Sequence, residues 1–72
     1  MIIKISRSTR KKNIIETYVQ FPPQIDFQTA YRLLGNRSNG INIKRATIEQ
    51  VNLQQITKLP IRYDLTTNQV IR

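Results

Sequence analysis

The fold is decided by residues 1–21, MIIKISRSTRKKNIIETYVQF. Apolar residues alternate with other residues at both ends of this stretch, which is the period-2 pattern of half-buried strands. The expected inward positions are Met1, Ile3 and Ile5 in the first strand and Ile15, Thr17, Val19 and Phe21 in the second. We expect the two strands to pair as a hairpin. Its connection, SRSTRKKN at residues 6–13, lacks the Asn-Gly or Asp-Gly signal of a tight turn, so a mobile loop is predicted.

A short helix is predicted to follow the hairpin. Pro22 and Pro23 end the second strand because neither can donate a hydrogen bond to a ladder. Asp26 is typical of a helix N-cap, and Gly35 stands where a left-handed residue would end the helix. The apolar residues at helical spacing, with Leu33 beside them, are Phe27, Ala30, Tyr31 and Leu34. We expect this stripe to pack on the sheet.

The middle of the chain has two interpretations. Residues 35–40, GNRSNG, are loop-like, and Asn39-Gly40 suits a turn before a further strand. The apolar pattern of INIKRATI, residues 41–48, changes parity across Lys44 and Arg45, which predicts either a bulge or the end of the strand. Residues 47–50, TIEQ, then fit the capping box of a short helix, whereas the alternation of Val51 and Leu53 fits a strand. We favour the helix for residues 47–56.

The last fifteen residues, KLPIRYDLTTNQVIR, predict a second hairpin. Ile61, Tyr63 and Leu65 alternate as in a strand, and the polar residues 66–68 turn the chain back. The chain is therefore predicted to be one small α+β domain over residues 1–72. Its expected elements are an N-terminal β-hairpin, one short helix, a further strand and a C-terminal β-hairpin.

The composition excludes several classes of function. The chain has no cysteine and no histidine, which rules out disulfides, zinc fingers and catalysis by an imidazole base. The carboxylates are widely spaced in the sequence, at Glu16, Asp26, Glu49 and Asp64, and no acid–base pair is visible. We therefore expect a binding protein that is not an enzyme and that uses no cofactor or metal ion.

The first twelve residues do not resemble a targeting segment. Their apolar residues precede the basic ones, which reverses the order of a signal peptide, and the apolar run is too short to span a bilayer. We expect a cytoplasmic protein without membrane contact.

Net charge is the strongest global feature. Twelve lysines and arginines against four acidic residues give a formal charge of +8 on 72 residues. Such an excess attracts polyanions, among which nucleic acid, either DNA or RNA, is the commonest partner of a small basic domain. An acidic protein is the second candidate, and charge retained for solubility is the simpler explanation.

Two basic groups are the candidate contacts. The first comprises Lys4, Arg7, Arg10, Lys11 and Lys12, and no acid precedes Glu16. These long side chains are predicted to contact phosphates, with a merely solvated turn as the alternative. The second group comprises Arg32, Arg37, Lys44 and Arg45, of which the last three are the candidate contacts; it either converges into a second patch or is scattered over the surface.

Tyr18 is the candidate aromatic contact. It shares the expected outward face of the second strand with Gln20, where its ring would stack on an unpaired base. The simpler interpretation is a tyrosine that only favours the strand.

The alternative function is a basic adaptor or linker that seats on an acidic protein, with Tyr18, Arg62 and Tyr63 as anchors. The order of a short strand, a basic loop, ETYVQF, a helix and NGINIK is similar to the small basic linker domains of cyanobacterial light-harvesting complexes. This resemblance covers about two thirds of the chain and implies a protein partner. The paired glycines of those domains are replaced here by Asn39-Gly40, and no site residue is transferred. A homodimer is also predicted if residues 1–5 form an edge strand.

Overall fold

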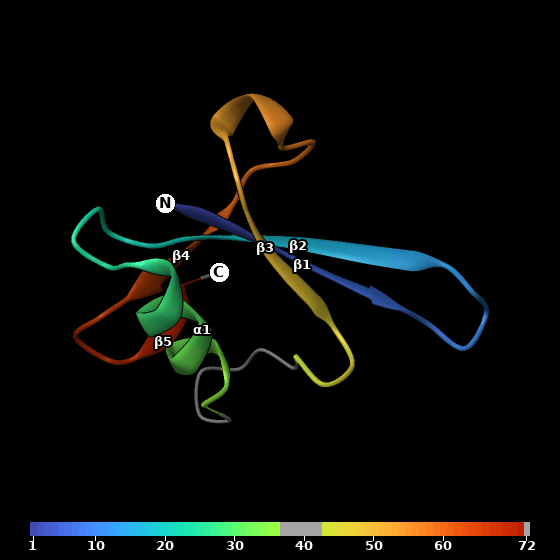
Figure 1. The fold of residues 1–72 in the computed structure, drawn as a ribbon, viewed down its shortest axis with the longest axis horizontal. Helices are drawn as coiled ribbons and strands as arrows, with labels where there is room; N and C mark the ends of the chain where they lie inside the picture. The colour runs from blue at the N-terminus through green and yellow to red at the C-terminus, as the bar shows by residue number, and fades with distance from the viewer. Residues whose placement is uncertain (37–42, 72) are drawn as a thin grey trace.

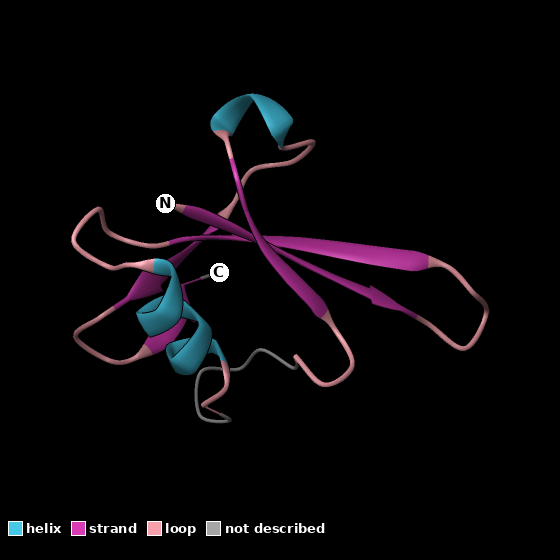
Figure 2. Ribbon diagram, viewed as in Figure 1, coloured by secondary structure: helices cyan, strands magenta, loops and turns pink. Residues whose placement is uncertain are grey.

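The computed structural model describes residues 1–36 and 43–71. A five-stranded sheet in the order β3-β1-β2-β4-β5 carries one helix against one face (Figure 1 and Figure 2). The elements are β1 (Ile2–Ser8), β2 (Ile14–Gln20), α1 (Phe27–Leu34), β3 (Thr47–Val51), the 3-10 turn η2 (Leu53–Gln55), β4 (Ile61–Asp64) and β5 (Gln69–Ile71). This confirms the α+β architecture and both hairpins. Within the described residues, no helix is long and apolar enough to cross a membrane.

The N-terminal hairpin forms the centre of the sheet. β1 pairs antiparallel with β2 on one side and antiparallel with β3 on the other. The prediction that residues 1–5 form an edge strand was therefore wrong, because both edges of β1 are already paired. β4 runs parallel to β2, with Val19 opposite Ile61, since residues 52–60 carry the chain across the sheet before β4 begins.

The main core lies between the sheet and α1. Its buried members are Ile3, Ile5, Val19, Phe21, Ala30, Leu34 and Tyr63. Four of them, Ile3, Ile5, Val19 and Phe21, are residues that the period-2 pattern placed inward, so the prediction is confirmed for these four. Phe21 and Tyr63 stack with ring centroids 4.8 Å apart. The Tyr63 hydroxyl has no hydrogen-bond partner within the described residues, and burial raises its pKa.

A smaller cluster lies on the opposite face of the sheet. It consists of Ile2, Tyr18 and Val51, with Ile56 packed against them. Ile56 belongs to the segment between η2 and β4, so the crossing segment covers this face and removes apolar surface from water. Both faces of the sheet centre are therefore partly buried.

The helix begins at the predicted N-cap but differs from the prediction at Tyr31 and at Gly35. The Thr29 backbone N–H donates to Asp26 Oδ1 at 2.9 Å, so Asp26 is the N-cap. Tyr31 was expected in the buried stripe but is 51% exposed, and Leu33 packs against the core instead. With Leu33 and Leu34 both inward, Tyr31 lies about a quarter turn from the buried face at 100° per residue. Gly35 has a φ of −71°, so the prediction of a left-handed conformation at this residue was wrong.

The prediction of a helix over residues 47–56 was also wrong. Residues 47–51 form β3, in which Ile48 lies opposite Ile5, and pairing with the central strand outweighs the local helix signal. A turn at Lys44 and Arg45, with Arg45 at a φ of 60°, precedes β3 and explains the change of parity. The predicted loop at residues 37–40 and the start of a strand at residues 41–42 lie outside the described residues.

The cap at Asp26 gives a direct test of the helix. Asp26→Ala is expected to lower the melting temperature because the Thr29 N–H loses its acceptor, whereas Asp26→Asn keeps a side-chain oxygen and is expected to lower it much less. Hydrogen bonds from Thr29 lower the Asp26 pKa, so this stabilisation is present above the ordinary carboxyl pKa and is lost as pH falls through the lowered value. Thermal melts of both variants at neutral and acidic pH check this. Equal losses at neutral pH would show that Asp26 acts through its charge.

Candidate nucleic-acid interface

The outer half of the N-terminal hairpin extends past its neighbouring strands. The last pair between β1 and β3 is Ser6 with Thr47, and the pairs between β2 and β4 are at Val19 and Gln20. β1 and β2 continue to pair beyond these limits, through Arg7 with Ile15 and Ser8 with Ile14. Residues 7–15, which we name the ribbon, therefore project from the sheet as two strands and a turn (Figure 1).

The end of the ribbon is a closed turn. The Thr9 N–H donates to the Asn13 carbonyl at 2.8 Å, and the Lys12 N–H donates to the Thr9 carbonyl at 3.0 Å. The Asn13 N–H also donates to Thr9 Oγ1 at 3.2 Å. Lys12 has a φ of 62°, which reverses the chain direction within the turn. The predicted connection of residues 6–13 was therefore too long, because β1 extends to Ser8.

Four cationic side chains surround this end of the molecule. Arg7, Arg10, Lys11 and Lys12 are all exposed. Among the described residues, Lys4 and Glu49 form an ion pair. None of the four cationic residues takes part in it. Their charges are therefore not neutralised by a carboxylate of the described residues and are available to an external anion.

The carboxylates are held elsewhere. Asp26 caps α1, Glu49 pairs with Lys4, and Asp64 Oδ1 accepts from the Thr66 N–H at 2.9 Å. Glu16 accepts from the Tyr18 hydroxyl and lies opposite Ser6, just inside the base of the ribbon. Glu16 is therefore the described carboxylate next to the ribbon in the strand register, and it accepts from Tyr18. No group of three potential metal-ligating acids is found in the described residues.

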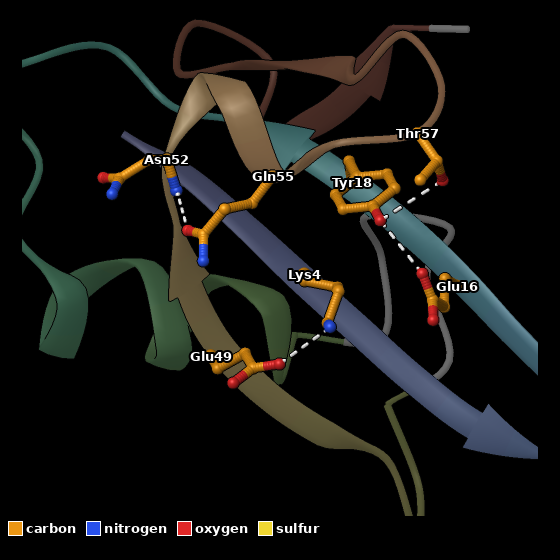
Figure 3. Close-up of polar contacts among 7 residues, drawn as sticks. All are labelled: Lys4, Glu16, Tyr18, Glu49, Asn52, Gln55 and Thr57. Carbon is orange, nitrogen blue, oxygen red and sulfur yellow. Dashed lines mark hydrogen bonds and ion pairs between the residues drawn. The ribbon is translucent and has the colours of Figure 1, made fainter.

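Lys4 does not join the ribbon. It lies opposite Tyr18 and Glu49 on neighbouring strands, on the face away from α1. Its Nζ is 3.0 Å from Glu49 Oε1, and this hydrogen bond is the main reason that the pKa of Lys4 is raised (Figure 3). The structure therefore gives Lys4 a partner within the sheet and separates it from the four cationic residues with which it was grouped.

Tyr18 was expected to expose its ring, and this was wrong. The residue is 3% exposed because Ile56 and the adjoining crossing segment pack over it. Its hydroxyl donates to Glu16 Oε2 at 2.9 Å and lies 3.5 Å from Thr57 Oγ1 (Figure 3). A base cannot stack on this ring unless the crossing segment moves away.

Two residues of the second basic group lie near the base of the ribbon. β3 runs antiparallel to β1 and begins at Thr47, opposite Ser6, so the turn at Lys44 and Arg45 lies at the end of the sheet from which the ribbon projects. Both residues are exposed. Of the other two members, Arg32 lies in the last turn of α1, and Arg37 lies outside the described residues. The strand register thus brings together cationic residues more than thirty positions apart in the sequence.

Sequence reasoning missed two features of this region. The proximity of the two basic groups depends on the pairing of β3 with β1, which was not predicted. Ile14 and Ile15 remain 68% and 40% exposed on the ribbon, although Ile15 was expected to point into the core. Their exposure follows from the reach of the ribbon beyond the helix and the flanking strands.

A search of protein-family models, curated proteins and solved structures found no match to this chain.

Proposed function

We propose that this protein binds nucleic acid through phosphate contacts made by the ribbon and by the turn at its base. The observation that carries the proposal is that four cationic side chains, those of Arg7, Arg10, Lys11 and Lys12, are exposed at the end of a projecting hairpin and take no part in the ion pair between Lys4 and Glu49. The proposed contacts are Arg7, Arg10, Lys11 and Lys12 on the ribbon and Lys44 and Arg45 beside it.

Physical chemistry favours a phosphate backbone as the partner. Each phosphate that a lysine or arginine neutralises releases condensed counterions, and this release supplies most of the favourable free energy of non-specific binding. Long side chains on a narrow ribbon can reach phosphates in several directions. Phosphate contacts also need less exact geometry than contacts to base edges.

The adaptor alternative is weakened by two of its expected anchors. Tyr18 and Tyr63 are 3% and 4% exposed, so neither presents its ring to a partner. Of the three expected anchors, only Arg62 is exposed. Interface hot spots require side chains that a partner can bury. An acidic protein therefore becomes an outcome of the test rather than the favoured partner.

The test is direct binding at low salt. Fluorescence anisotropy with a labelled duplex and a labelled single strand is expected to show binding to both, with log affinity falling linearly against log salt. The slope is expected to be about −0.9 for each duplex phosphate contacted. If neither oligonucleotide binds at low salt, the proposal fails and an acidic protein becomes the leading candidate partner.

A further inference from the structure

Two exposed isoleucines stand beside the cationic residues of the ribbon. Ile14 and Ile15 are 68% and 40% exposed, although they lie in a strand whose later residues are buried. Ile15 lies opposite Arg7, and Ile14 lies opposite Ser8 next to the turn. Exposed apolar side chains surrounded by positive charge indicate a surface that an anionic partner covers.

The two isoleucines point in opposite directions. Successive side chains of a strand alternate between its faces, so Ile14 lies on one face of the ribbon and Ile15 on the other. A flat protein surface laid against the ribbon covers only one of them. A groove that receives the ribbon encloses both, and the adjacent positive charge favours a groove with anionic walls and apolar contacts on its floor.

The major groove of B-form DNA has the required dimensions. It is about 12 Å wide and about 8.5 Å deep, and it admits a two-stranded β-ribbon. Two strands lie about 4.8 Å apart, and the three residues from Arg7 to Thr9 extend the ribbon by roughly 10 Å beyond Ser6. The phosphates that line the groove supply the negative charge, and thymine presents its C5-methyl group there as an apolar contact.

We propose that the ribbon enters the major groove of duplex DNA and that Ile14 and Ile15 contact thymine methyl groups while the neighbouring cationic residues hold the phosphates. This inference rests on the proposed function and names its substrate class. Duplex RNA is excluded because the major groove of A-form RNA is too narrow for side chains to read, and a single strand offers no groove.

The test removes only the methyl groups. In an A·T-containing duplex, deoxyuridine replaces thymidine, which leaves every hydrogen-bonding group in place. The parent protein is expected to lose about fourfold in affinity for each methyl contact removed, at about 0.8 kcal/mol per buried carbon. The variant with Ile14→Ser and Ile15→Ser is expected to bind both duplexes equally, because serine carries no methyl group that could contact thymine.

The controls separate this inference from the proposed function. Leu59→Ser, at a side chain 91% exposed on the crossing segment, should keep the parental preference for thymine. The double isoleucine variant should keep the parental salt slope, because its charge is unchanged. If the parent binds thymine and uracil duplexes equally, or if the double variant keeps the preference, the groove inference is wrong while phosphate binding stands. Absence of all oligonucleotide binding would instead overturn both.

Discussion

Replacing Arg7, Arg10, Lys11 and Lys12 together with glutamine is expected to weaken binding to unrelated duplexes and single strands by similar factors. Loss of four duplex phosphate contacts flattens the plot of log affinity against log salt by up to about 3.6 units, so the loss of affinity grows by up to roughly 4,000-fold for each tenfold decrease in salt. The loss of affinity should not depend on the oligonucleotide sequence, because phosphates carry no sequence information. Anisotropy titrations over a salt series measure affinity and slope together.

This quadruple variant should remain folded. All four side chains are exposed and lie beyond the last pairs of β1 with β3, and surface changes of this kind alter stability little. Glutamine keeps the length of the side chains, so the turn at residues 9–13 retains its backbone hydrogen bonds. The melting temperature is therefore expected to stay near that of the parent.

A matched control removes charge elsewhere. Glutamine at Arg32, Lys58 and Arg62 lowers the net charge by a similar amount on α1, the crossing segment and β4. This triple variant should bind with a slope close to the parental one. If the quadruple variant instead binds every oligonucleotide as tightly as the parent, the ribbon is only a solvated turn, and Lys44 and Arg45 become the leading contacts.

The second large effect is expected from the core. Leu34→Ala should lower the free energy of unfolding by about 2–5 kcal/mol, through lost burial and the cavity left behind. Leu34 is fully buried with Ile3 and Val19, which belong to the central hairpin. A domain of this size has little stability to lose, so the variant should be largely unfolded at room temperature.

Thermal and urea melts followed by circular dichroism measure this loss. Leu59→Ala is the matched control because it makes the same chemical change at a side chain 91% exposed, and it should melt close to the parent. A Leu34→Ala variant that melts like the parent would show that α1 does not pack on the sheet through this residue.

The hairpin and the helix were predictable because their signals are local. The period-2 alternation placed Ile3, Ile5 and Val19 on the buried face, and Asp26 marked the start of the helix. Both signals depend on neighbours within a few residues along the chain. The structure confirms them because tertiary packing acts in the same direction.

The errors occurred where distant segments decide the outcome. Tyr18 alternates like an exposed residue, yet it is buried because Ile56 and its neighbours cross over it. Residues 47–50 contain a helix-start signal, yet they pair with β1 as a strand. The path of the crossing segment and the register of β3 could not be predicted from the periodicity of the sequence.

The candidate site was predictable only in part. The positive charges of residues 7–12 and 44–45 are plain in the sequence, but their common position at one end of the sheet follows from the pairing of Ser6 with Thr47. The exposure of Ile14 and Ile15 depends on how far β3, β4 and α1 extend. A sequence pattern predicts a strand, but it does not show where the neighbouring strands and the helix end.

The central claim is that nucleic acid contacts the ribbon, and NMR titration locates that contact most directly. Amide chemical shifts of the labelled protein are followed as a short A·T-containing duplex is added at low salt. We expect the largest changes to cluster at residues 7–15, with smaller changes at residues 44–46 and none in the segment at residues 53–59. Changes centred on that segment or on the exposed face of α1, with the ribbon unaffected, would contradict it.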